Sequence, residues 1–233
     1  MENFEYIKRN LNSLKEELAD AAKSAGCVTP KLVAVTKSAT DSELAYLLSI
    51  GQSAIGENRP QELLRRGELL RTLGYSPELH EIGNLQSNKA KIVCPVSTLI
   101  HSLDSESLAK EINRTAEKLN KKVDVLIEIN SGREPQKGGI MPELAETFAA
   151  GLSRYPNIRL RGLMTMGPNL SDPEDLRRYF SLTKELFEKL RYTYSSDGDP
   201  ILSMGMSESF RVAAEEGSTL VRVGRRLFIK DQQ

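Results

Sequence analysis

The sequence predicts a single (β/α)8 barrel, and two observations lead to this fold class. Eight short apolar runs recur along the 233 residues, and a helical segment separates almost every pair of them. Strict alternation predicts a parallel sheet, and such barrels often occupy roughly 200–250 residues as one domain. An open doubly wound sheet usually carries a glycine-rich turn after its first strand, whereas here Lys37-Ser38-Ala39-Thr40 follows. We therefore expect one barrel domain over residues 1–233.

The first element expected is a helix over residues 2–25 that covers the barrel from outside. Its apolar residues, among them Ile7, Leu11 and Leu14, recur at spacings of three and four, and Gly26 suits its C-cap. The eight strands are expected near residues 31, 53, 79, 97, 123, 158, 200 and 219. The helices that follow them are expected over 41–50, 60–73, 89–93, 104–120, 142–152, 173–192 and 207–216.

Composition and charge argue against several kinds of function. With 32 basic and 32 acidic residues, the overall charge gives no reason to bind nucleic acid or a membrane. No apolar run approaches the ~18 residues of a membrane span, and the first residues lack the pattern of a secretory signal. The two cysteines are isolated and the two histidines are too few for a histidine-rich metal site. We expect a cytoplasmic protein without a bound metal.

Chemistry in a barrel of this kind lies at the carboxyl ends of the strands. The first strand runs from Lys31 and ends in Lys37, so Lys37 is a candidate, whereas Lys31 is expected to be a surface charge. The other strands are followed by amides, hydroxyls and glycines, and Glu57 is the one carboxylate in the set. That scarcity argues against a glycosidase and against a hard-metal site. The positions are Lys37, Glu57-Asn58, Gly83 to Asn88, His101-Ser102, Asn130-Ser131, Met164 to Met166, Met204 to Ser207, and Gly224-Arg225.

The end of the chain has the character of an anion site. Gly205 and Ser207 precede an expected helix, with Ser207 as its N-cap, and Gly224 follows the last strand. Each of these residues also fits ordinary turn and cap chemistry, but together they follow the two strands after which barrels often bind phosphate. Arg222, inside the last strand, could point outward to the helices or inward to an anionic or aromatic-nitrogen partner.

A strand-end lysine opposite a phosphate cradle suggests a Schiff base with a phosphorylated carbonyl compound. Two chemistries fit this combination: a lysine aldolase acting on a sugar phosphate, and a protein that binds pyridoxal 5′-phosphate (PLP).

Ordered motifs between about Leu32 and Phe228 favour the second chemistry. With them the chain resembles the pyridoxal phosphate homeostasis protein family (YggS/PROSC-like), which shares the fold-type III barrel of the alanine racemase N-terminal domain. The motifs are LVAVTK (32–37), GEN (56–58), HEIGNLQSNK (80–89), HSLD (101–104), RGLMTM (161–166), LSMGMS (202–207) and GSTLVRVG (217–224).

The resemblance implies a role for each matching position. Lys37 corresponds to the lysine that forms the imine with PLP, and Arg222 to the arginine that approaches the pyridine nitrogen. Ser207, Gly224 and the backbone N–H of Arg225 correspond to phosphate-binding positions. The remaining pocket positions implied are Asn58 near the cofactor ring and the 83–88 loop at the pocket mouth. The departures from the family pattern are Arg59-Pro60, Glu81, Ser209, Arg225 and Ile229; we expect the Arg225 side chain to point outward.

Two further implications concern activity. A permanently charged arginine cannot accept a hydrogen bond from a pyridinium, so it should keep the ring nitrogen unprotonated and make the ring a weaker electron sink. The related racemases take a catalytic tyrosine from a second domain, and this chain ends shortly after Phe228. We expect a PLP holder that exchanges the cofactor with apo-enzymes, as a monomer; a racemase-like PLP enzyme is the alternative and a sugar-phosphate lysine aldolase a remoter one.

Overall fold

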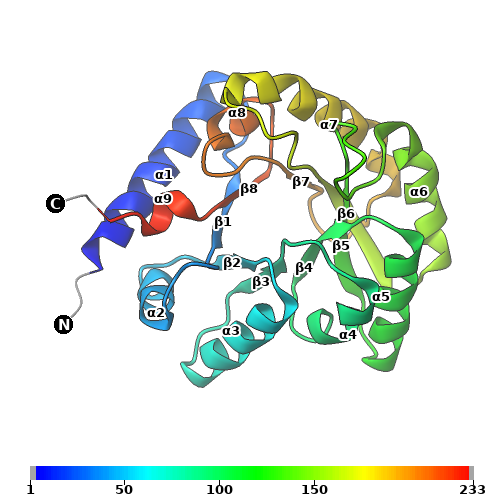
Figure 1. Cartoon of the computed structure of the whole chain (residues 1–233), viewed down its shortest axis with the longest axis horizontal. Helices are drawn as coiled ribbons and strands as arrows, with labels where there is room; N and C mark the ends of the chain where they lie inside the picture. The colour runs from blue at the N-terminus through cyan, green and yellow to red at the C-terminus, as the bar shows by residue number, and fades with distance from the viewer. Residues whose placement is uncertain (1–3, 231–233) are drawn as a thin grey trace.

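The computed structural model describes residues 4–230 and forms a closed barrel of eight parallel strands (Figure 1). The strands follow one another in chain order around the barrel, and β1 pairs with β8 to close it. This architecture confirms the predicted (β/α)8 fold. The strands are β1 (Lys31–Val35), β2 (Ala54–Glu57), β3 (Glu78–Glu81), β4 (Leu99–Leu103), β5 (Val123–Glu128), β6 (Ile158–Met164), β7 (Ile201–Ser203) and β8 (Leu220–Val223).

Helices surround the barrel and bury the outward faces of the strands (Figure 1). Short 3-10 turns extend several of them, for example Pro173–Leu176 before α7. The α-helices are α1 (Glu5–Ser24), α2 (Asp41–Ser49), α3 (Pro60–Thr72), α4 (Ala90–Val93), α5 (Glu106–Lys118), α6 (Ala145–Gly151), α7 (Arg177–Lys189), α8 (Phe210–Glu215) and α9 (Arg225–Phe228).

Helix α1 is the expected covering helix. Its apolar stripe, including Leu11, Leu14 and Leu18, is buried against a cluster that contains Val221 and Val223 of β8. It also lies along α8 and α9 (Figure 1). The predicted start at residues 2 and 3 lies outside the described part of the chain. Sealing the β1–β8 side of the barrel is therefore the packing role of this helix.

The barrel interior contains a small apolar layer made by inward-facing residues of several strands. Val33, Ala54 and Leu220 form one cluster and Leu99, Leu126 and Met164 another, and Ile201 packs against both. Buried polar side chains, among them His101, Ser203 and Arg222, also point into the barrel. The apolar clusters thus fill part of the barrel between its amino-terminal and carboxyl-terminal mouths.

Three element boundaries differ from the prediction. The apolar Val96 suggested a strand there, but it lies in a turn whose N–H donates to Val93 O (3.1 Å), so β4 begins at Leu99. His101 and Ser102 consequently lie within the strand rather than at its end. Likewise β1 ends at Val35, two residues before Lys37.

The predicted helix start at Ser207 is also wrong. Residues 207–209 form a turn in which the Ser209 and Phe210 N–H groups both donate to Met206 O, at 3.0 and 2.9 Å. The Met206 N–H donates to Ser209 Oγ (3.2 Å), and α8 begins only at Phe210. Ser207 is therefore a turn residue and not an N-cap. The one-turn helix α9 after β8 was not predicted.

None of the helices within residues 4–230 is long and apolar enough to cross a membrane. Over the same residues, no group of three or more His, Cys, Asp or Glu side chains is placed to hold a metal ion.

Candidate site at the carboxyl-terminal mouth of the barrel

Lys37 lies in a turn directly beyond β1, and its side chain is exposed. It forms no ion pair with any residue between positions 4 and 230. Its neighbour Thr36 is buried, and the Thr36 hydroxyl donates to Glu57 Oε1 at 2.5 Å. The buried Thr36 thus fixes the backbone of the turn, and the Lys37 amine on the same turn is accessible to a ligand.

Arg66 of α3 fixes the other side of this turn. Its guanidinium, only 4% exposed, donates to Ala39 O and pairs with Asp41. Its Nε lies 3.7 Å from Glu57 Oε1. Glu57 therefore faces the helical layer, and the expectation that it belongs to the polar face of the site is wrong. Burial raises the pKa of Glu57, against the opposing effects of the Thr36 hydrogen bond and the Arg66 charge.

Arg222 points into the barrel, which decides between the two orientations left open by the sequence. It is 4% exposed, and its Nη1 donates to Ser203 O (3.1 Å) and Ser203 Oγ, while Nη2 donates to Thr165 O (3.2 Å). Burial lowers the pKa of Arg222 to about 10, and the charge of Glu128 opposes this effect. The guanidinium thus stays protonated at neutral pH. Its Nε donates to no acceptor within the described residues, so it can serve a ligand.

A second carboxyl group that was not predicted lies near Arg222. Glu128 ends β5 and is 6% exposed, and burial and the nearby Asp104 raise its pKa to about 7, against the effect of Arg222. Burial also raises the pKa of Asp104. The expectation of a single carboxylate near this mouth is therefore wrong. The alternation of Asp124, Leu126 and Glu128 along β5 puts these side chains on one face of the strand, but it does not say which face points into the barrel.

The loops after β7 and β8 present free backbone donors. The N–H groups of Ser207, Glu208, Gly224 and Arg225 donate to no acceptor in the described part of the chain. A Cβ on Gly224 would lie 2.8 Å from Val35 O, so only glycine lets this backbone pass so close to the end of β1. The Arg225 side chain is exposed and pairs with Glu208 (3.2 Å), in agreement with the outward orientation expected.

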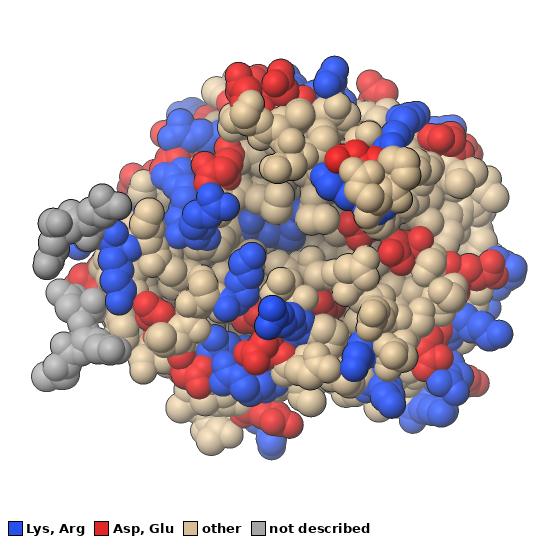
Figure 2. All heavy atoms as spheres, viewed as in Figure 1, with Lys and Arg blue, Asp and Glu red and all other residues tan. Residues whose placement is uncertain are grey.

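Basic side chains gather around the central hollow of the face seen in Figure 2, over β1, β2, β8 and α9. The protein as a whole has no net charge. A local excess of positive charge combined with free N–H groups suits an anionic ligand such as a phosphate.

Asn58 and Gly83 join the loops after β2 and β3. A Cβ on Gly83 would lie 2.2 Å from Asn58 O, so the two backbones are in contact. The Gly83 N–H donates to Glu81 Oε1 (3.1 Å), and the Glu81 side chain is fully buried. The exposed side chain of Asn58 thus has a fixed backbone next to the Lys37 turn, since β1 and β2 are paired through Val35 and Gly56.

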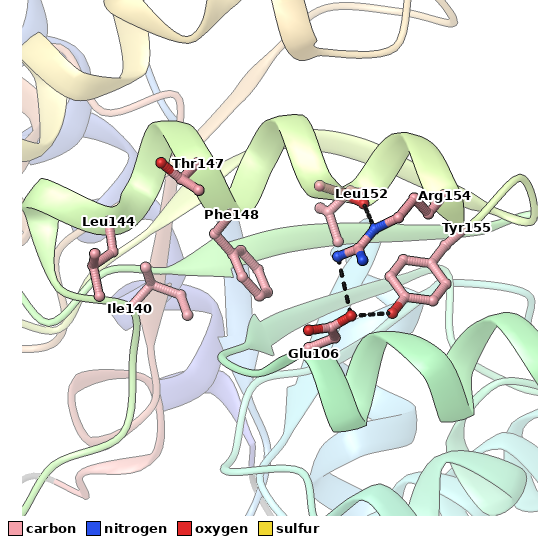
Figure 3. A pocket seen from close by; sticks show the side chains of 9 residues that line it. Glu106, Ile140, Leu144, Thr147, Phe148, Leu152, Arg154 and Tyr155 are labelled. Carbon is pink, nitrogen blue, oxygen red and sulfur yellow. Dashed lines mark hydrogen bonds and ion pairs between the residues drawn. The ribbon is translucent and has the colours of Figure 1, made fainter.

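A cavity of about 270 Å³ lies elsewhere, between α5 and α6 (Figure 3). Apolar side chains such as Leu144 and Phe148 form part of its wall. At one end of the cavity, the Glu106 carboxylate forms an ion pair with Arg154 (3.0 Å) and accepts a hydrogen bond from the Tyr155 hydroxyl (3.0 Å). None of the residues expected at the functional site lines this cavity.

The donor set at the carboxyl-terminal mouth fits PLP. Free N–H groups after β7 and β8 suit its phosphate, the free donor of Arg222 suits its ring nitrogen, and Lys37 suits its aldehyde. Fold and site together therefore define a PLP-type barrel with the fold of the alanine racemase N-terminal domain. The family model of that name, "Alanine racemase, N-terminal domain", matches residues 6–231.

Similarity to known proteins identifies the family within this class of PLP-type barrels. The chain is 42% identical over 225 residues to the pyridoxal phosphate homeostasis protein of Aquifex aeolicus, covering 96% of both chains. The chain belongs to the pyridoxal phosphate homeostasis protein family. PipY of Synechococcus elongatus, solved with PLP bound, is 28% identical with a TM-score of 0.82, covering 96% of this chain and 100% of PipY. An alanine racemase of Clostridium difficile shares the fold at 17% identity and a TM-score of 0.75, over 99% of this chain and 58% of the racemase.

Proposed function

We propose that this chain binds PLP and holds it covalently through Lys37 in a single barrel domain. When bound, PLP supplies an aldehyde that condenses with a lysine amine to give an imine and one water. The observation that carries the proposal is Lys37 itself, an exposed lysine without an ion-pair partner among the described residues, on an anchored turn at the barrel mouth. The relatives named for PLP and the PLP-bound PipY support the choice of cofactor over a sugar phosphate.

The other expected site residues contact the phosphate and the ring of PLP in this proposal. The Ser207 hydroxyl and the N–H groups of Ser207, Gly224 and Arg225 bind the phosphate, since they have no protein acceptor in the described part of the chain. Asn58 borders the ring beside the Lys37 turn. Arg222, which is buried within the barrel, would donate to the ring nitrogen with its free Nε.

The test of binding is the absorption spectrum of the purified protein before and after borohydride reduction. We expect a band near the edge of the visible range, and after reduction a covalent adduct on the Lys37 peptide in the mass spectrum. Lys37→Ala should lose both signals. Lys31→Ala is the matched control, because Lys31 lies at the opposite end of the same strand, and it should keep both. A wild-type protein that gains no such band in excess PLP would refute the proposal.

Within this proposal the protein stores PLP and passes it to apo-enzymes, as the name of its relatives suggests. The chemical support is Arg222. A guanidinium that stays protonated can only donate to the ring nitrogen, so this nitrogen stays unprotonated and withdraws electrons weakly. A cofactor held in this way is a weaker electron sink for chemistry at the substrate carbon, which suits storage.

A racemase-like activity is the second candidate, and Glu128 is the observation that favours it. A buried carboxyl with a pKa near 7 can both take and give a proton at neutral pH. The two roles are separated by measuring racemisation of amino acids against a Lys37→Ala control, together with the reactivation of an apo-enzyme by the loaded protein. Turnover comparable with that of a dedicated racemase would exclude the storage role, and reactivation without turnover would support it.

The proposal also includes a monomer in the cytoplasm. The two cysteines, Cys27 and Cys94, are free thiols, as a reducing compartment would keep them. Light scattering of the purified protein should give a mass near that of the single chain, 25.9 kDa. Twice this value would contradict the monomer.

A further inference from the structure

Five polar side chains form an unbroken hydrogen-bonded line along the barrel axis. Arg222 Nη1 contacts Ser203 Oγ, which lies 3.1 Å from His101 Nδ1. His101 Nε2 lies 2.9 Å from His80 Nδ1, and His80 Nε2 lies 3.2 Å from Glu78 Oε2. These side chains come from β8, β7, β4 and β3, and we refer to them as the axial chain. It runs from the site at the carboxyl-terminal mouth to the opposite end of the barrel.

The direction of every hydrogen bond in the axial chain follows from its two ends, because Arg222 can only donate and the Glu78 carboxylate can only accept. The Ser203 hydroxyl accepts from Arg222 and has no acceptor other than His101 Nδ1 among the described residues, so it donates to His101 Nδ1. His101 must then carry its proton on Nε2 and donate to His80 Nδ1, and His80 in turn donates from Nε2 to Glu78. Both imidazoles are therefore neutral Nε2–H tautomers. A proton added to either inner nitrogen would place two N–H groups against each other.

The surroundings of the two histidines favour these neutral forms. Burial lowers the pKa of His101 well below its ordinary value, and the charge of Arg222 and the neighbouring His80 act in the same direction. Burial also lowers the pKa of His80, with Lys31 in support and the Glu78 carboxylate opposed. These groups act on the pair from β1, β3 and β8, and Asp124 of β5 and Arg161 of β6 line the same amino-terminal cavity as His80.

The far end of the axial chain reaches a cavity of about 210 Å³ at the amino-terminal mouth. Lys31, Glu78 and His80 line it together with Asp124 and Arg161. The Glu78 side chain is 41% exposed and also forms an ion pair with Lys31. Lys31 is an exposed surface charge, as expected, and Glu78 is its partner. The axial chain is thus fixed to a charged pair at one mouth and ends on Arg222 at the other.

We infer that Ser203, His101 and His80 are positioning residues that hold the Arg222 guanidinium in place beneath the ligand. Within residues 4–230, the hydrogen-bond acceptors of Arg222 are two backbone carbonyls and the Ser203 hydroxyl, and none is a carboxylate. Glu128 is buried and close enough for its charge to act on Arg222. With Ser203 removed, the guanidinium can turn toward this carboxyl instead of the ring nitrogen. The inference rests on the proposed function, because it assigns the free donor of Arg222 to the ring of PLP.

The first experiment uses the ligand-free protein. The chain has only two histidines, so ¹⁵N-histidine NMR gives one pair of ring nitrogens for each, assigned with His80→Gln and His101→Gln. We expect both rings to be neutral with the proton on Nε2 across the neutral range. Ser203→Ala should move only the Nδ1 signal of His101 toward that of a nitrogen without a hydrogen-bond donor. A ring protonated on Nδ1, or one that titrates like a free imidazole, would overturn the axial chain.

The second experiment tests whether the axial chain acts on the ring nitrogen. We expect Ser203→Ala to weaken PLP binding about tenfold, the effect of losing one hydrogen bond to a charged group. Binding of an analogue with CH in place of the ring nitrogen should be the same in Ser203→Ala and wild type. Ser218→Ala is the matched control, since its buried hydroxyl binds only backbone groups between β7 and β8.

The outcomes separate this inference from the proposed function. Equal weakening of PLP and of the analogue in Ser203→Ala, or equal weakening of PLP in Ser203→Ala and Ser218→Ala, would overturn the positioning role while PLP binding stands. A wild-type protein that takes up neither compound would overturn the proposed function, and the NMR result would still decide the axial chain.

Discussion

The buried carboxyl of Glu81 should make the stability of this protein fall as pH rises, and Glu81→Gln should remove the contribution of this group and leave that of Glu128. The side chain is fully buried, Oε1 accepts from the Gly83 N–H at 3.1 Å, and Oε2 has no partner in the described part of the chain. Burial raises the pKa of Glu81 from 4.5 to about 8. The Gly83 hydrogen bond opposes this rise, and the charge of Glu57 adds to it.

The sign and size follow from this pKa. Between the unfolded value of 4.5 and about 8 the folded protein holds a proton that the unfolded chain has released. The free energy of unfolding must therefore decrease as pH rises through this window, by about 1.4 kcal/mol per pH unit in its middle. From about pH 5.5 to about pH 7.5 the loss from this one group is about 2.5 kcal/mol. Below 4.5 its contribution is complete.

The assay is urea unfolding of the wild type and Glu81→Gln at several pH values in this window. Glutamine has the shape of the neutral acid and keeps the acceptor for Gly83, so the two proteins should be similar near pH 5.5 and diverge above it. The variant should be the more stable protein near neutral pH, by about 2 kcal/mol. Glu68→Gln removes an exposed carboxyl from α3 and should keep the wild-type slope. Parallel wild-type and Glu81→Gln curves would refute the reasoning.

Two further predictions concern the backbone around the site. Arg66→Gln should lower the free energy of unfolding by about 3 kcal/mol, because it leaves the buried partners of Arg66 without a cation. Arg65→Gln is the control, since Arg65 is half-exposed and pairs with the same Asp41; it should lower the free energy of unfolding by less than about 1 kcal/mol. Equal losses in chemical denaturation would contradict the role given to burial. Gly83→Ala should cost about 2 kcal/mol, since its Cβ would lie 2.2 Å from Asn58 O, and an unchanged unfolding midpoint would contradict this close packing.

The barrel itself could be predicted because its signal is repeated eight times. Each strand is a short apolar run followed by a helix, so an error of two or three residues at one boundary, as at Val96, leaves the count and the order unchanged. The position of Lys37 was predictable for the same reason, since any residue just after the first strand must lie at the carboxyl-terminal mouth. The boundary at Ser207 was not predictable, because turn and N-cap positions favour the same residues.

The sequence alone determined the closed parallel barrel, the covering helix and the mouth at which the loops of Lys37, Ser207 and Gly224 lie, because these depend on the order of elements. Only the tertiary structure decided which way individual side chains face. Strands of a parallel barrel are buried on both sides, so apolar residues occupy both faces and alternation no longer marks the inside. For that reason Arg222 and Glu128 were found to face inward, and Glu57 outward, only once the strands were paired and closed.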